Sequence, residues 1–177
     1  MLMNRLKPLL RARAIQQRVK ELGQEIAADH QGQTLTVLAL LDGAYCFVAD
    51  LARCIDLPDL RLHFVRASSY GKGTTSRGKV ALEPLPDLRG QTVLLVDDIL
   101  DTGRTLQTVK LAVEGATLRT CVLLDKPTRR VPDGLQCADY IGFTIPDVFV
   151  VGYGLDHGGQ YRHLPDICSL REAPSAD

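Results

Sequence analysis

Apolar residues recur along the chain with two spacings, one typical of helices and one typical of buried strands. In residues 13–30 they return every three or four positions among charged and amide side chains, which predicts an amphipathic helix. Mostly apolar runs predict strands that are buried on both faces, as in a parallel sheet. These runs cover residues 35–41, 93–96 and 118–124.

The remaining elements are predicted from alternation and from turn residues. Residues 61–68 alternate apolar and polar positions, as a half-exposed strand does. Residues 70–79 combine glycines, hydroxyl residues and basic residues, a composition typical of a mobile loop. One helix is predicted at residues 44–53 and another over Leu106, Val109, Leu111 and Val113, with further strands at residues 80–85, 140–145, 148–153 and 166–170.

The alternation of strands and helices, without a repeat or a linker, predicts an α/β fold with a mainly parallel sheet flanked by helices. The chain has 177 residues, of which 45% are hydrophobic, and we expect all of it to form one domain. Two carboxylates, those of Asp97 and Asp98, directly follow the apolar run at residues 93–96. We therefore expect that strand to end after Val96.

Charge and cysteine content narrow the functional classes. Lys plus Arg and Asp plus Glu both number 21, so no net positive charge suits a nucleic-acid surface. No apolar run is long enough to span a membrane, and the first residues lack a signal-peptide pattern. The five cysteines form no CxxC pair, which argues against a zinc site or a disulfide framework. We expect buried free thiols in a cytoplasmic protein.

Polar clusters stand at the ends of three predicted strands. In open α/β sheets, ligands bind outside the carboxyl ends of the strands, so three clusters on one edge favour a site. A single cluster has an ordinary alternative, since Asp101 or Thr102 also suits the N-cap of the following helix. The clusters are Asp42-Gly43, Asp97-Asp98 with Asp101, and Asp125-Lys126.

The loop of residues 102–105 has the composition of a phosphate site. Its two threonines, its glycine and the start of the next helix offer hydroxyls, backbone N–H groups and a positive dipole end. An apolar strand ending in two acids also occurs in nucleoside triphosphatases. The chain has no GxxxxGK followed by Ser or Thr, so that class is excluded. A phosphoacceptor pocket is disfavoured because its acids would follow an earlier strand.

Residues 93–106 resemble the phosphoribosyl-pyrophosphate motif of the type I phosphoribosyltransferases, an apolar strand followed by two acids and Asp-Thr-Gly-x-Thr. The resemblance runs in order over almost the whole chain, and the later motifs are similar to those of the hypoxanthine-guanine phosphoribosyltransferases. It implies the type I fold with a small hood formed by the N- and C-terminal segments. The later motifs are residues 68–71, 124–127, 141–147, 149–156 and 161–165.

This resemblance implies an enzyme of purine salvage. It would transfer the 5-phosphoribosyl group from phosphoribosyl pyrophosphate to hypoxanthine or guanine, giving IMP or GMP and pyrophosphate. It also implies Mg²⁺ as cofactor and a homo-oligomer, dimer or tetramer. The preference among hypoxanthine, guanine and xanthine stays open. A regulator that keeps the fold as a nucleotide sensor is the alternative.

The resemblance also assigns roles to residues at the acidic strand end. Asp101 matches the carboxylate that takes a proton from N7 or N9 of the base, a task that suits a partly desolvated acid. Asp97 and Asp98 match the acidic pair that faces the ribose hydroxyls with Mg²⁺, and Asp156 matches the acid beside a second Mg²⁺. The residues that match the 5′-phosphate loop are Thr102, Gly103, Arg104 and Thr105.

Base and pyrophosphate contacts are implied elsewhere in the chain. Lys126 matches a donor to the purine O6, which disfavours adenine because its 6-amino group is no acceptor. The other matches are Phe149 stacking on the base, Val150 and Asp156 beside it, Arg162, Asp42 and Gly43 at the pyrophosphate, and Ser69 and Tyr70 beginning the closing loop.

One position departs from the family pattern. The pyrophosphate loop of the family usually reads Leu-Lys-Gly or Leu-Arg-Gly, often after a cis peptide, whereas this chain has Leu41-Asp42-Gly43. A carboxylate repels pyrophosphate unless its side chain points away. We therefore predict weaker pyrophosphate binding, and slightly more room for the sensor alternative.

Overall fold

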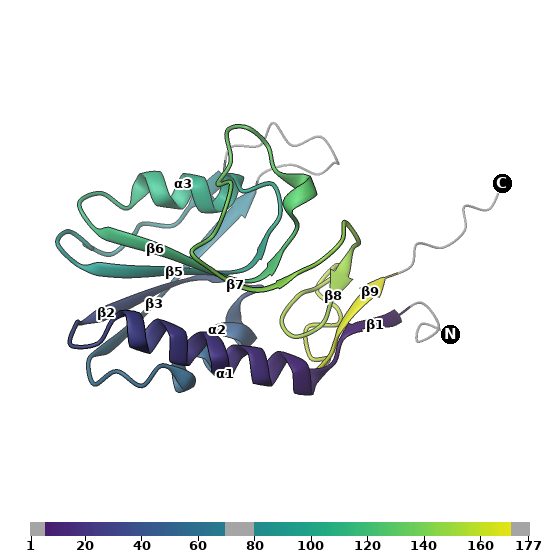
Figure 1. Ribbon diagram of the computed structural model, residues 1–177. Coiled ribbons are helices and arrows are strands. Elements are labelled where there is room, and N and C mark those ends of the chain that lie inside the picture. Colours follow the sequence, from purple (N-terminus) through teal and green to yellow (C-terminus); the bar gives the residue numbers. More distant parts are fainter. Residues whose placement is uncertain (1–5, 70–79, 171–177) are drawn as a thin grey trace.

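A computed structural model describes residues 6–69 and 80–170 (Figure 1). Six strands form the central sheet: β2 (Leu35–Leu41), β3 (Leu60–Ser69), β4 (Val80–Leu82), β5 (Thr92–Leu100), β6 (Thr117–Asp125) and β7 (Tyr140–Thr144). Their order is β4-β3-β2-β5-β6-β7, and every neighbouring pair is parallel except β3 with β4. The predicted α/β class with a mainly parallel sheet is confirmed.

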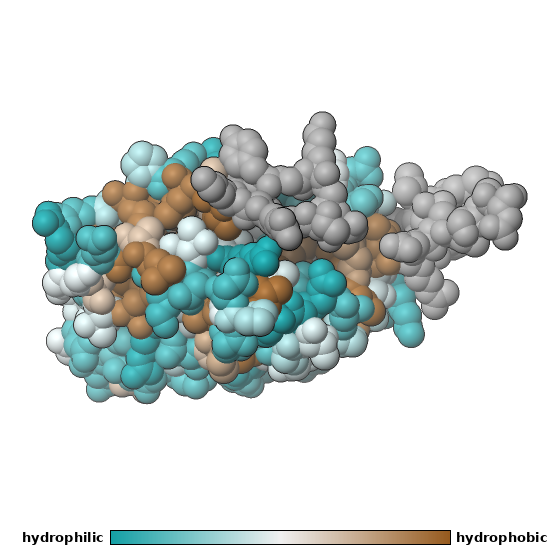
Figure 2. Space-filling model, turned by 90° about the horizontal axis from the view of Figure 1, so that it is seen from above, coloured by the Kyte–Doolittle hydropathy of each residue, from teal (hydrophilic) through white to brown (hydrophobic). Residues whose placement is uncertain are grey.

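Helices cover both faces of this sheet. Helices α1 (Ala12–Asp29) and α2 (Tyr45–Cys54) lie on one face, and α3 (Arg104–Ala112) lies on the other (Figure 1). The apolar stripe of α1 is buried as its spacing predicts, because each of its members faces the sheet. The helix predicted over Leu106, Val109, Leu111 and Val113 is confirmed except at Val113, which is the C-cap, and its exposed side includes Leu111. Seen from above, apolar surface gathers over the part of the molecule that contains α3 (Figure 2).

Strand β5 does not end after Val96, so that prediction was wrong. It continues to Leu100, and Asp97 and Asp98 lie inside it. The extension pairs with β6 alone, because the pairing between β2 and β5 stops at Ala39 and Val96. The last residues of β5 therefore lack a neighbour on the β2 side. Polar side chains are tolerated there because the sheet opens at this point.

The two ends of the chain meet in a second sheet. It contains β1 (Leu6–Leu10), β9 (Ile167–Leu170) and β8 (Val150–Val151), in the order β1-β9-β8 with antiparallel pairs. Strand β1 was not predicted, because its apolar and polar residues do not alternate. Its partner, β9, also lies near the opposite end of the sequence. The resemblance places the hood in these same segments. The strand predicted at residues 148–153 shortens to two residues.

Other outcomes concern the cysteines, the helices and the predicted mobile loop. All five cysteines are free thiols, but only Cys121 and Cys168 are buried, and Cys137 is exposed. In the described part of the chain, no helix has the length and apolar character to cross a membrane. The loop predicted at residues 70–79 lies outside the described residues.

Candidate functional site

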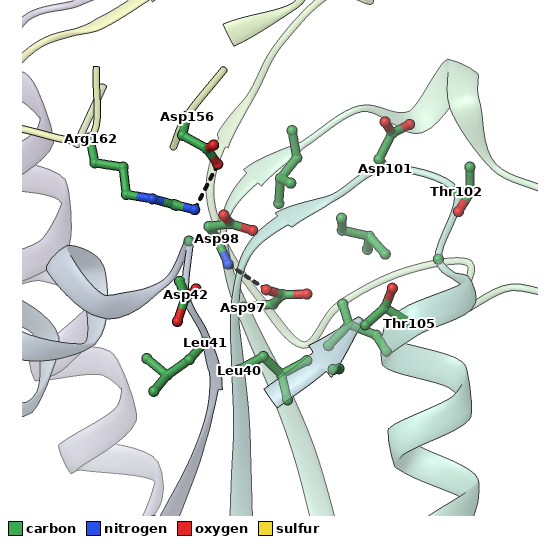
Figure 3. A pocket seen from close by; sticks show the side chains of 16 residues that line it. Leu40, Leu41, Asp42, Asp97, Asp98, Asp101, Thr102, Thr105, Asp156 and Arg162 are labelled. Carbon is green, nitrogen blue, oxygen red and sulfur yellow. Dashed lines mark hydrogen bonds and ion pairs between the residues drawn. The ribbon is translucent and has the colours of Figure 1, made fainter. Parts of the chain in front are cut away.

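A cavity of about 430 Å³ lies between the carboxyl ends of β2 and β5 and the start of α3 (Figure 3). The strand that follows β2 in sequence, β3, lies on one side of the β2–β5 pair, and the strand that follows β5, β6, lies on the opposite side. Such a reversal of strand order is where open α/β sheets bind ligands. The predicted site residues that line the cavity are Asp42, Gly43, Asp97, Asp98, Asp101, Thr102, Gly103, Thr105, Asp156 and Arg162.

Asp97 and Asp98 place two adjacent carboxyls at the centre of this cavity. The backbone N–H of Asp98 donates to Asp97 Oδ1 at 2.9 Å, which turns that carboxyl back along the strand (Figure 3). Burial raises the pKa of Asp97 well above its usual value, and the charge and the side-chain hydrogen bond of Asp98 raise it further. Burial also raises the pKa of Asp98, although Asp97 and Arg162 oppose that shift. The pair therefore retains a proton more readily than isolated carboxyls do.

The Asp97→Asn variant should be more stable than the wild type at neutral pH. A carboxyl whose pKa rises on folding stabilises the fold below its unfolded pKa, near 4, and this stabilisation is lost as pH rises through the folded pKa. Removing the charge should raise Tm by about 2–4 °C if the gain is about 1 kcal/mol. Thermal unfolding from pH 4 to 8 measures this, and a gain that shrinks as pH rises would contradict the assignment.

Gly43 brings backbone directly against this acidic pair. A Cβ at this position would overlap the Asp98 carboxyl, so only glycine allows the turn to pass so close. Gly154, at φ 99°, packs in turn against the Gly43 carbonyl. The Leu41–Asp42 peptide is cis, as the resemblance implies. The turn after β2 and the loop after β8 therefore meet at the same wall of the cavity.

The Asp42 side chain is paired with an arginine that the sequence analysis missed. Arg66 on β3 approaches Asp42 Oδ1 with Nη2 at 3.1 Å and Nε at 3.2 Å. The two strands are parallel, and Leu41 stands opposite Arg66 in their register. An arginine at the end of a neighbouring strand was the available signal. The charge of Asp42 is therefore balanced at the cavity rim.

The loop after β5 turns its carbonyl groups away from the cavity. Val131 N donates to the Thr102 carbonyl at 3.2 Å, and Leu135 N donates to the Gly103 carbonyl at 3.0 Å. Gly103 has φ 82° and is the N-cap of α3, without a side-chain cap. The N-cap position is therefore Gly103 and not Asp101 or Thr102, although the backbone N–H of Arg104 donates to Thr102 Oγ1 at 3.5 Å. The first N–H groups of α3 point out of its N-terminus, where Thr102 and Thr105 line the cavity.

Arg104 and Asp101 differ in how they relate to the cavity. Arg104 does not line it, and its Nε lies 3.7 Å from Asp133 Oδ1. Asp101 lines the cavity on the side away from the Asp97–Asp98 pair (Figure 3). Arg129, which the sequence analysis missed, donates to Asp101 Oδ1 at 3.1 Å, and this contact raises the pKa of Arg129.

Arg130 is a third missed residue, and it joins the ends of β5 and β6. Its guanidinium donates to the carbonyls of Leu100 at 2.6 Å, Asp101, and Lys126 at 3.1 Å. It also pairs with the Asp125 carboxylate, and both side chains are about nine-tenths buried. The acid of the predicted Asp125-Lys126 cluster is therefore committed to a structural contact, and Arg130 fixes Asp101 relative to Lys126.

Replacing Arg130 by methionine should destabilise the fold by about 3 kcal/mol or more, because it leaves the Asp125 charge buried without its partner. Arg18→Met is the matched control, since Arg18 also donates to two backbone carbonyls but lies on α1, far from this charge. Urea unfolding compares the two variants. Equal losses would contradict the account, whereas the Asp125→Leu/Arg130→Met variant should recover part of the stability.

Comparison with known proteins agrees with this geometry. A family model, the phosphoribosyl transferase domain, matches residues 6–157. A hypoxanthine-guanine phosphoribosyltransferase of Aquifex aeolicus is 44% identical over 174 residues, covering 95% of this chain and 96% of its own. The crystal structure of a hypoxanthine phosphoribosyltransferase from Staphylococcus aureus superposes with a TM-score of 0.87 at 39% identity, covering 96% and 94% of the two chains.

The chain belongs to the hypoxanthine-guanine phosphoribosyltransferase family. Within this phosphoribosyltransferase, three of the residues predicted to contact the base do not line the main cavity, whereas Asp156 does. Lys126 is buried at the end of β6, and its backbone N–H donates to the Leu100 carbonyl at 3.0 Å. The Phe149 ring is half exposed and meets His157 edge to face at a centroid distance of 5.3 Å. Val150 is buried in β8. Their purine contacts stay predictions.

Two of the remaining predicted residues begin the closing loop. Ser69 is the last residue of β3, and Tyr70 lies outside the described residues. The resemblance assigns the loop that follows β3 to closure over the reacting centre. That role stays a prediction for this phosphoribosyltransferase.

The predicted metal ligands, Asp97 and Asp98 at one Mg²⁺ and Asp156 beside a second, stay predictions. In residues 6–69 and 80–170, no three His, Cys, Asp or Glu side chains gather into a single metal site. The Asp156 carboxylate accepts from Arg162 Nη2 at 2.8 Å and from the backbone N–H of Gly159 at 2.7 Å. The proton-retaining pair of Asp97 and Asp98 still fits Mg²⁺, which usually takes one or two carboxylates plus substrate phosphate oxygens in such sites.

Proposed function

We propose that the chain transfers the 5-phosphoribosyl group from phosphoribosyl pyrophosphate to a 6-oxopurine, hypoxanthine or guanine, in purine salvage. The products are IMP or GMP and pyrophosphate. The observation that carries this proposal is one cavity at the strand-order reversal, lined by both the acidic pair and the 102–105 loop. The names of relatives at 42–44% identity support the same reaction.

The proposed reaction exchanges one bond at the sugar C1 for another. The bond from C1 to the pyrophosphate oxygen breaks, and its electrons leave with pyrophosphate. A ring nitrogen of the base forms the new bond to C1, and the base loses a proton. Asp101 accepts that proton, because its carboxylate lines the cavity and Arg130 links the backbone of Asp101 to that of Lys126, the proposed base contact.

The other cavity residues orient the two phosphate groups and the sugar. Asp97 and Asp98 accept hydrogen bonds from the ribose hydroxyls, which offset the repulsion between adjacent carboxyls. The first N–H groups of α3 and the hydroxyls of Thr102 and Thr105 bind the 5′-phosphate. Arg162 and the backbone at Gly43 face the pyrophosphate. The sugar, the 5′-phosphate and the pyrophosphate are thus assigned to different walls of the cavity.

Magnesium is proposed to enter with phosphoribosyl pyrophosphate. Asp97 and Asp98 would hold it together with substrate oxygens, and the ion would neutralise charge on the departing pyrophosphate. The pKa of Asp97 is raised by burial and by its neighbour, so the pair must lose a proton before it can bind the ion fully. Binding of the magnesium complex should therefore tighten as pH rises.

The extent of the domain and its assembly are also proposals. We infer that residues 1–177 form one domain, since β9 lies beyond the family match at residue 157 yet pairs with β1 and β8. The dimer or tetramer and the cytoplasmic location rest on the resemblance. Size-exclusion chromatography with light scattering would measure the oligomer.

A single assay tests the proposed reaction. The protein is mixed with Mg²⁺, phosphoribosyl pyrophosphate and one of four bases, namely hypoxanthine, guanine, xanthine or adenine, and nucleotide formation is followed. Turnover is expected with hypoxanthine or guanine and not with adenine. Nucleotide formation with none of the bases would refute the enzyme and favour the sensor. Because Arg66 balances the charge of Asp42, the acid in the pyrophosphate loop no longer favours a nucleotide sensor.

A further inference from the structure

The cavity is lined by more acidic than basic side chains. Its lining contains five aspartates and, among the described residues, a single arginine: Asp42, Asp97, Asp98, Asp101, Asp156 and Arg162. Arg162 is already committed to Asp156 at 2.8 Å and to the Gly154 carbonyl at 2.6 Å. Like charges repel strongly where water is partly excluded. A cationic side chain at the Asp42 side would therefore favour pyrophosphate binding in addition to magnesium.

Arg66 stands where such a cation is needed. It lies near the end of β3, and Ala67, the next residue, lines the cavity. Its backbone is fixed to the β4 segment, since Arg66 N donates to Glu83 Oε2 and Glu83 N donates to the Arg66 carbonyl, both at 3.1 Å. Its side chain is 62% exposed. The backbone is therefore held, while the guanidinium extends into solvent at the rim.

The contact between Arg66 and Asp42 is easily exchanged for another anion. Nε and Nη2 of Arg66 both point at the same oxygen, Asp42 Oδ1. A guanidinium binds more strongly when its two N–H groups meet two separate oxygens, as on a phosphate. Ion pairs between exposed side chains contribute little to stability. A pyrophosphate group therefore offers Arg66 a better partner than Asp42 does.

We propose that Arg66 is a pyrophosphate-binding residue, and that its guanidinium moves from Asp42 to pyrophosphate oxygens when phosphoribosyl pyrophosphate binds. Asp42 then serves as the internal anion that holds Arg66 at the rim of the empty cavity. This inference deepens the proposed function and rests on it. It assigns the cation of the pyrophosphate subsite to the strand beside the Asp42 turn.

Four variants of the full chain test this role: Arg66→Gln, Asp42→Asn, the double variant, and Arg61→Gln as control. Arg61 is an exposed arginine of the same strand that pairs with Asp59 at 3.4 Å. Arg66→Gln should raise KM for phosphoribosyl pyrophosphate about 10-fold or more, because a charge-assisted hydrogen bond is lost. KM for the base should change less than about twofold, and Arg61→Gln should match the wild type.

The double variant separates binding from simple charge balance. If Arg66 contacts pyrophosphate, the double variant stays about as weak as Arg66→Gln. A return to the wild-type KM would show that Arg66 only neutralises Asp42, and an unchanged KM in Arg66→Gln would equally overturn the inference. Calorimetric titration with Mg²⁺ and pyrophosphate gives the same comparison without turnover. A failure of the proposed function is thus distinguished from a failure of Arg66.

Discussion

Replacing Asp101 by asparagine is expected to lower kcat by about 10²-fold or more, with little change in KM for phosphoribosyl pyrophosphate. Asparagine has the shape of aspartate, and its side-chain oxygen can still accept the hydrogen bond that Arg129 donates to Asp101 Oδ1. The side chain therefore keeps its place and loses only its ability to take a proton. Steady-state kinetics with hypoxanthine and guanine measure the loss.

Asp147→Asn is the matched control for this experiment. Asp147 is the second acidic partner of Arg129, at 3.7 Å, and it does not line the cavity. The kcat of the Asp147→Asn variant should stay within about twofold of the wild type, since exposed ion pairs contribute little to stability. Single-turnover measurements establish that the measured rate is the rate of the chemical step. An Asp101→Asn variant with the wild-type chemical rate would reject Asp101 as the proton acceptor.

Replacing Lys126 by alanine is expected to raise KM for 6-oxopurines by about 10–100-fold, the range of a hydrogen bond to a charged group. KM for phosphoribosyl pyrophosphate should rise much less. Lys126 is buried at the end of β6, beside the carbonyls that Arg130 holds, so its position is fixed before the base arrives. An ammonium group can only donate, which suits an oxo group and not an amino group.

Lys110→Ala is the control for this second variant, because Lys110 lies in the last turn of α3 and is exposed. It should leave both KM values unchanged. Equal losses for the base and for phosphoribosyl pyrophosphate in Lys126→Ala would count against a specific contact with the purine. Thermal unfolding of the same variant excludes a general loss of folded protein.

Most strands of the central sheet could be predicted because each is marked by a local pattern of apolar residues. Strand β2 was predicted with its observed bounds, since all but one of its seven residues are apolar and Thr36 alone interrupts the run. Helix α1 was predicted within one residue at each end. Strand β1 was missed because its pairing with β9 joins opposite ends of the chain. A pattern of neighbours carries no information about such a contact.

The end of β5 shows how tertiary structure overrides local pattern. Asp97 looks like a strand terminator, yet the strand continues because β6 still supplies hydrogen bonds on one side. Acidic residues persist in a strand where the opposite neighbour, β2, diverges and leaves a cavity. That divergence depends on the turn after Leu41, which is distant in sequence.

Three arginines of the site could not be predicted from the sequence alone. Arg66, Arg129 and Arg130 each act on an aspartate or a carbonyl through contacts between separate strand ends. Arginine is a common surface residue, so its type indicates nothing without its partner. The aspartates were found because they follow apolar strands, whereas the roles of Lys126 and Phe149 came from resemblance to a family and from no local signal.

The stoichiometry of the products shows whether the base, and not water, reacts with the sugar in this cavity. Phosphorus NMR of a reaction that contains the protein, Mg²⁺, phosphoribosyl pyrophosphate and hypoxanthine resolves IMP and pyrophosphate together. The account predicts equal amounts of both, and neither product when the base is omitted. Pyrophosphate without IMP would mean that water, and not the base, reacts at the sugar. The absence of both products with every 6-oxopurine would contradict the assignment of this cavity as the site of phosphoribosyl transfer.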